Sequence, residues 1–120
     1  MMKKVMLVED DATMMGLLNT LLEMEGFGVV KITEDDPEKL LDTIRQERPA
    51  LVLMDVHLRQ VNGFDLLRMI KGEDDTKDVK VLMSSGIDFS TECEQAGADG
   101  FILKPYMPDA LIMQIRQMVV

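Results

Sequence analysis

Short runs of consecutive apolar residues alternate with stretches of helical periodicity along the whole chain. Each run has the length of a strand and lacks the regular polar alternation of a half-exposed strand, which is typical of parallel sheets covered on both faces. Parallel neighbours need crossover connections, and the helical stretches between the runs can supply them. The alternation therefore predicts a doubly wound α/β fold with five parallel strands and five helices. The expected strands are Val5–Val8, Gly28–Ile32, Leu51–Met54, Val79–Met83 and Gly100–Leu103.

Capping residues and helix breakers indicate where the intervening helices begin and end. Asp11 and Asp36 are predicted N-caps, because a short carboxylate can accept hydrogen bonds from the free amides of a first helical turn. Gly26 and Pro49 are predicted to end the first and second helices. The segment Thr91–Ala98 has the weakest helical pattern, so the fourth helix is expected to be shorter than the others.

Length, charge and cysteine content limit the function classes that fit. A chain of 120 residues suits one hydrophobic core, so we expect a single domain over residues 1–120. With 13 Lys and Arg against 22 Asp and Glu, the net charge of −9 opposes direct nucleic-acid binding. No apolar stretch has the length of a membrane span, and Cys93 is the only cysteine, which indicates a cytoplasmic protein with an inert thiol. Most of the 12 methionines are expected in the core.

Charged and hydroxyl side chains stand at the ends of four of the five predicted strands. The carboxyl ends of parallel strands meet at one edge of a doubly wound sheet, so these side chains are expected to converge. Clustered carboxylates repel one another, and a divalent cation, most often Mg²⁺ where phosphate is involved, relieves the repulsion. A hydroxyl and a lysine can hold phosphoryl oxygens, so the set predicts phosphoryl transfer to Asp55. The residues are Glu9 and Asp10 after the first strand, Asp55 at the end of the third, Ser84 and Ser85 after the fourth, and Lys104 after the fifth.

Four stretches of sequence at these strand ends carry a family resemblance: Val8–Asp11, Leu53–Asp55 with Asn62–Gly63 downstream, Met83–Gly86 and Ala96–Pro105. Together they resemble the receiver domains of bacterial two-component response regulators, and the resemblance covers essentially all 120 residues. It implies a flavodoxin-like fold with strand order 2-1-3-4-5. It also implies a signalling protein that accepts a phosphoryl group from a histidine kinase or a His-phosphotransfer protein.

The resemblance assigns the phosphoryl and metal ligands residue by residue. It implies that Asp55 is the phospho-acceptor and that Asp10 binds Mg²⁺ directly, with Mn²⁺ able to replace it. Glu9 would support the ion through a water molecule, and the main-chain carbonyl of His57 would complete the protein ligands. A part for the His57 side chain in tuning the reaction is the less favoured interpretation, because the family motif needs only the carbonyl.

The resemblance also implies a switch that reports phosphorylation to a partner. Ser85 would move to meet the phosphoryl group, Lys104 would pair with it, and Phe101 holds the family's aromatic switch position. The peptide bond between Lys104 and Pro105 is expected to be cis. The switched surface would lie around the fourth helix, the fifth strand and the fifth helix. It would control a downstream effector protein or an output domain outside this chain, and such an acceptor is not a turnover enzyme.

Three features depart from the family pattern. Arg59 stands where these proteins usually have proline, so the loop after Asp55 is expected to be more mobile. Phe101 lacks the hydroxyl of the more common tyrosine, so no hydrogen bond can stabilise one of its rotamers. The segment from Ser85 to Lys104 is shorter than expected by roughly one helical turn, which predicts a truncated fourth helix.

Three other interpretations use the same residues. A Mg²⁺-dependent phosphatase of the haloacid-dehalogenase type also forms an aspartyl phosphate, but it needs Asp-x-Asp after the first strand, where this chain has Glu9, Asp10 and Asp11. A flavodoxin-like nucleotide binder needs hydroxyls and amides at that place, and these carboxylates would repel its phosphate. A degenerate receiver could serve only as an interaction module, although no key position is lost here.

Overall fold

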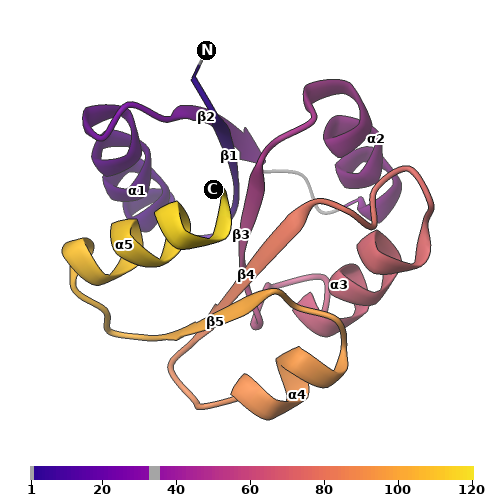
Figure 1. The fold of residues 1–120 in the computed structure, drawn as a ribbon. Helices are drawn as coiled ribbons and strands as arrows, with labels where there is room; N and C mark the ends of the chain where they lie inside the picture. The colour runs from indigo at the N-terminus through magenta and orange to yellow at the C-terminus, as the bar shows by residue number, and fades with distance from the viewer. Residues whose placement is uncertain (1, 33–35) are drawn as a thin grey trace.

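The computed structural model describes residues 2–32 and 36–120, which form a five-stranded sheet with helices on both faces (Figure 1). All strand pairs are parallel, and the order β2-β1-β3-β4-β5 confirms the predicted topology. The strands are β1 (Lys4–Val8), β2 (Gly28–Ile32), β3 (Leu51–Asp55), β4 (Lys80–Ser85) and β5 (Gly100–Leu103). The helices are α1 (Ala12–Met24), α2 (Pro37–Glu47), α3 (Gly63–Gly72), α4 (Ser90–Gln95) and α5 (Pro108–Met118).

The sheet separates two hydrophobic clusters. Helices α1 and α5 cover one face, while α2, α3 and α4 cover the other (Figure 1). Successive strand side chains point to opposite faces, so Val5 and Leu7 of β1 pack under α1 and α5, whereas Met6 and Val8 pack on the other side. Burial on both faces explains why the strands read as continuous apolar runs.

The helix termini follow the predicted capping chemistry. The Asp11 carboxylate accepts hydrogen bonds from the amides of Thr13 (2.9 Å) and Met14 (3.1 Å). Asp36 accepts one from the Glu38 amide at 3.0 Å, and α2 then begins with a proline in its first turn. Gly26 follows α1 with φ +89°, a backbone conformation that favours glycine. Both N-caps and the glycine stop are thus confirmed.

Several boundaries differ from the prediction, those of β4 and α4 the most. Ser84 and Ser85 are the last two residues of β4 rather than residues after it, because the backbone pairing with β3 and β5 continues through them. Helix α4 spans Ser90–Gln95 instead of Thr91–Ala98, and with six residues it is short, as the spacing predicted. Cys93 lies on this helix with no exposed surface.

The methionines divide between core and surface. Met6, Met15, Met54 and Met83 are buried, and Met14, Met69 and Met118 pack partly buried against the core, so fewer methionines than expected are fully buried. Met24 on α1 and Met107 before α5 are 78% and 72% exposed. Within the described residues, no helix combines the length and the apolarity needed to cross a membrane.

Candidate functional site

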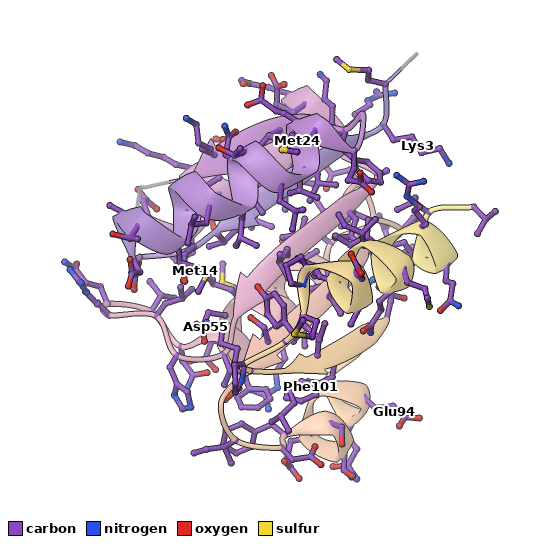
Figure 2. All side chains as sticks on the ribbon, turned by 90° about the vertical axis from the view of Figure 1, so that its left-hand side faces the viewer. Lys3, Met14, Met24, Asp55, Glu94 and Phe101 are labelled. Carbon is purple, nitrogen blue, oxygen red and sulfur yellow. The ribbon has the colours of Figure 1, made fainter. Side chains whose placement is uncertain are left out.

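The predicted site residues of three strand ends meet at one edge of the sheet. The Lys104 ammonium lies 2.5 Å from Asp55 Oδ2 and 3.8 Å from Glu9 Oε1. The Glu9 and Asp55 side chains are only 10% and 14% exposed. In Figure 2 Asp55 lies at the end of the molecule opposite Lys3, which precedes β1, so the cluster occupies the carboxyl ends of the strands. The convergence expected from the sequence is therefore present for these three side chains.

The loop after β3 is attached to Asp55 and to β4. The His57 amide donates to Asp55 Oδ1 at 2.9 Å, and the Val56 amide donates to the Ser84 carbonyl at 2.9 Å. Together with Lys104, the His57 amide occupies both oxygens of the Asp55 carboxylate. These contacts fix the direction in which the carboxylate points.

Glycine is required where α3 begins against this loop. A Cβ at Gly63 would lie 2.5 Å from the Asp55 carbonyl oxygen and 2.7 Å from that of Val56. The Gly63 amide donates to the Val56 carbonyl at 3.0 Å, and Asn62 caps α3 by accepting from the Phe64 amide at 2.8 Å. The Asn62–Gly63 pair noted in the sequence thus brings the start of α3 into backbone contact with the strand that carries Asp55.

The loop after β1 is tied to the loop after β3. The Asp10 amide donates to Glu9 Oε2 at 3.1 Å, which holds the Glu9 carboxylate over the sheet edge. Asp10 Oδ2 accepts a hydrogen bond from the Arg59 amide. A proline at position 59, as the family pattern suggests, would have no amide hydrogen to donate. Arg59 therefore gives this loop an anchor to Asp10, where the sequence led us to expect more mobility.

Burial and neighbouring charges shift the acid–base properties of the cluster. Burial raises the pKa of Glu9 above its ordinary value; the Asp55 and Asp11 charges act in the same direction, and Lys104 opposes them. Burial disfavours the Lys104 ammonium, but the hydrogen bond and charge of Asp55, together with Glu9, raise the pKa of Lys104 overall. The lysine is therefore positively charged at neutral pH and acts as the counter-ion of both carboxylates.

The predicted switch residues lie nearby but do not share these ion pairs. Ser85 is fully buried, its Oγ accepts from the Ile87 amide at 3.1 Å, and its carbonyl accepts from the Lys104 amide at 2.8 Å. Phe101 on β5 is half-buried and packs against the cluster on the face of α2, α3 and α4. The peptide between Lys104 and Pro105 is cis, as the resemblance implied.

Two contributions at this edge were not apparent from the sequence. Tyr106 follows Pro105, and its phenol is close enough to Lys104, Glu9 and Asp55 to interact with their charges; burial raises its pKa. The signal for Tyr106 was its place two residues after the lysine. The second contribution is the His57 ring, which packs against Phe89, 32 positions further along the chain. No local pattern indicates such a contact.

A family model described as the response regulator receiver domain matches residues 5–116. This chain belongs to that family. The receiver is 30% identical over 116 residues to the DNA-binding response regulator MtrA of Mycolicibacterium paratuberculosis, a match that covers 97% of this chain and 51% of MtrA. It thus spans about half the length of the curated relatives it matches.

Solved structures show the same fold as this receiver. A response regulator receiver domain protein (CheY-like) from Methanospirillum hungatei aligns with a TM-score of 0.87 and 27% identity, covering 99% of this chain and 94% of that one. The receiver domain of the sensor histidine kinase PA1611 from Pseudomonas aeruginosa aligns with a TM-score of 0.85 and 20% identity, covering 99% and 98%. That structure has a magnesium ion coordinated in its active site cleft.

Proposed function

We propose that this receiver accepts a phosphoryl group on Asp55, in a Mg²⁺-dependent reaction, from a histidine kinase or His-phosphotransfer protein of the cytoplasm. The acyl phosphate would alter the surface around α4, β5 and α5 and thereby control an effector protein or an output domain. The observation that carries this proposal is the Lys104 ammonium held 2.5 Å from the Asp55 carboxylate at the carboxyl end of the sheet. A half-buried aspartate with a lysine beside it suits phosphorelay signalling, the function of the family.

The chemistry assigns one step to each group. A carboxylate oxygen of Asp55 attacks phosphorus, the bond from phosphorus to the donor's leaving atom breaks, and the leaving atom keeps that electron pair. Lys104 balances the negative charge of the phosphoryl oxygens. Because the product is a mixed anhydride on the protein itself, we propose that the receiver is a self-phosphorylating and self-dephosphorylating acceptor rather than a turnover enzyme.

The donor set fits a hard divalent cation. Asp10, Asp55 and the His57 carbonyl offer only oxygen, with Glu9 placed to act through water, and Mg²⁺ prefers such ligands while keeping several waters of its own. Among residues 2–32 and 36–120, no group of three His, Cys, Asp or Glu side chains is arranged to hold a metal ion. Mn²⁺ takes the same donors. The bound ion would neutralise the phosphoryl oxygens during transfer.

We further propose that Ser85 and Phe101 respond to the phosphoryl group. Support comes from the hydrogen bond that joins the Lys104 amide to the Ser85 carbonyl, because it links the lysine to the end of β4. Phe101 lies on the neighbouring strand, paired with Met83. A rearrangement of Lys104 can thus reach both residues through the sheet.

Two other assignments receive less support. A haloacid-dehalogenase-type phosphatase is not favoured, because the chain matches the receiver model over residues 5–116. Direct DNA binding by this receiver conflicts with its net charge of −9, although relatives such as MtrA are DNA-binding proteins. We therefore propose that any contact with DNA is made outside residues 1–120.

The first prediction tests the acceptor. Incubation with Mg²⁺ and acetyl phosphate should add one phosphoryl group to the wild type and none to Asp55→Asn, because an amide is not a nucleophile of comparable strength. Mass spectrometry measures the addition, and hydroxylamine should release the phosphoryl group as phosphate and leave a hydroxamate on Asp55. Asp65→Asn is the matched control, since Asp65 is an exposed carboxylate on α3. Undiminished phosphorylation of the Asp55 variant would rule out this assignment.

A further inference from the structure

Three aromatic rings form a bridge between the loop after β3 and the start of α4. The His57 ring packs edge-on against Phe89, with centroids 5.7 Å apart and planes at 61°. Phe89 packs in the same way against Phe64 in the first turn of α3, at 5.7 Å and 86°. Phe64 and Phe89 also pack against the buried cluster on the face of α2, α3 and α4. The bridge therefore joins the acceptor loop, α3 and α4 at one point.

His57 connects this bridge to the acceptor. Its amide donates to Asp55 Oδ1 at 2.9 Å, so its backbone position depends on the state of that carboxylate. A hydrogen bond to an ionised carboxylate is roughly twice as strong as one to a neutral acceptor. Phosphorylation turns the carboxylate into a neutral acyl group, which weakens the bond if Oδ1 is the remaining carbonyl oxygen. The loop that carries the His57 ring is then less firmly held.

Phe89 connects the bridge to α4. It is the residue before the helix, and its carbonyl accepts the first helical hydrogen bond from the Cys93 amide at 2.8 Å. Its side chain makes no capping hydrogen bond, although the neighbouring Asp88 accepts from the Ser90 amide and hydroxyl. A helix of six residues has little stability of its own, so its position depends on packing. The position of Phe89 therefore decides where α4 begins.

We propose that Phe89 is a positioning residue that transmits the state of Asp55 to α4 through the ring of His57. This path runs along the α3 side of the sheet edge and does not pass through Ser85 or Phe101. It rests on the proposed function, because it needs a phosphoryl group on Asp55. In this proposal the His57 ring transmits a change of position to Phe89. This role is separate from that of the His57 main-chain carbonyl, which is a proposed metal ligand.

The test compares the response of α4 with that of the site itself. ¹⁵N-labelled protein is titrated with Mg²⁺ and beryllofluoride, a stable mimic of the phosphoryl group, and amide shifts are recorded for Ser85, Lys104 and Cys93. In Phe89→Leu we expect the Ser85 and Lys104 shifts to persist and the Cys93 shift to fall by about half or more, because the ring contact is lost. Phe89→Tyr keeps the ring and should retain the full response. Shifts are compared at equal occupancy, measured by ¹⁹F signals.

The outcomes separate this inference from the proposed function. If wild-type shifts around Asp55 do not change, the proposed function fails, and this inference fails with it. If they change but Cys93 responds equally in Phe89→Leu and the wild type, only the positioning role is overturned. Equal losses in the Leu and Tyr variants would also overturn it, since a ring contact predicts rescue by tyrosine. If Phe89→Leu unfolds below the working temperature, the same comparison is made at position 57. His57→Leu removes the ring that contacts Phe89, and His57→Phe keeps a ring there.

Discussion

Lys104 is held between two carboxylates, and this determines what its removal should do. In Lys104→Ala we expect Mg²⁺ binding to persist, because none of the proposed ligands is changed. The response of Ser85 and Phe101 to the phosphoryl group should weaken, since no ammonium remains to engage it. Amide shifts of these two residues with Mg²⁺ alone, and then with beryllofluoride, measure the two effects. An undiminished shift on adding beryllofluoride would contradict the role proposed for the lysine.

Cys93 is a buried thiol whose ionisation is opposed by its surroundings. Burial, with a smaller effect of Glu92, raises its pKa from 9.0 to about 11. The folded state therefore holds this proton more tightly than the unfolded chain does, so the contribution to stability is complete below pH 9 and lost as pH rises through about 11. The loss should reach up to about 3 kcal/mol. Urea unfolding of the wild type and Cys93→Ala between pH 8 and 11 measures it, and equal slopes in the two proteins would contradict it.

Within the candidate site, single side chains could be predicted from the sequence where a strand end places them. Glu9, Asp55 and Lys104 follow strands whose order the apolar pattern and the resemblance define, so their convergence was predictable. The hydrogen bond from the Arg59 amide to Asp10 and the packing of His57 on Phe89 were not predictable, because both depend on loop conformations. The conformation of a loop depends on tertiary contacts, and the local hydrophobic periodicity of the sequence does not show these contacts.

At the scale of elements, the start of α3 depends on Gly63. A methyl group there would meet two backbone carbonyl oxygens at 2.5 and 2.7 Å, and neither can move without displacing β3 or its loop. We expect Gly63→Ala to destabilise the receiver by about 2 kcal/mol or more and to slow phosphorylation of Asp55. Gly16→Ala in α1 meets no atom within 4 Å and should stabilise by roughly 0.5–1 kcal/mol. Urea unfolding of both variants measures the change in the free energy of unfolding. Equal changes in the two variants would show that the carbonyl oxygens near Gly63 do not exclude a larger side chain.

The elements themselves were largely predictable because their signals are local. Hydrophobic periodicity indicated the five strands, and capping residues indicated the ends of α1 and α2. The short spacing between Ser85 and Lys104 indicated the short α4. The extension of β4 to Ser85 was missed because two serines in sequence look like a turn. Pairing with β3 on one side and β5 on the other satisfies their backbone groups and overrides that preference.

For the whole molecule, we expect Mg²⁺ binding at the edge formed by Glu9, Asp10 and Asp55 to raise the free energy of unfolding. Burial raises the pKa of Glu9 above its ordinary value of 4.5, so ionisation of Glu9 costs folding stability as pH rises from that value through the raised one. Mg²⁺ at 100 times its dissociation constant should stabilise the folded wild type by roughly 2.7 kcal/mol. Asp10→Asn removes one repelling charge and one proposed ligand. It should be at least as stable as the wild type in EDTA and gain much less from Mg²⁺.

Thermal melts of both proteins, in EDTA and in excess Mg²⁺ at pH 7, measure this difference. Asp65→Asn serves again as the control, because its exposed carboxylate lies on α3 and should leave the Mg²⁺-induced shift unchanged. Equal shifts in the wild type and Asp10→Asn would show that Asp10 is not a ligand.

The position of Lys104 between Glu9 and Asp55 has a consequence for charge balance. With Asp10, the edge carries three carboxylates and one ammonium, an excess of two negative charges, which one Mg²⁺ ion would cancel. Under the proposed function, transfer of a phosphoryl group would raise the negative charge on Asp55 from one towards two, so an edge that is neutral with its ion would become negative. Lys104, already the counter-ion of both carboxylates, would then be drawn towards the new charge and away from Glu9. We therefore expect phosphorylation to shift the Lys104 charge from one acidic neighbour towards the other.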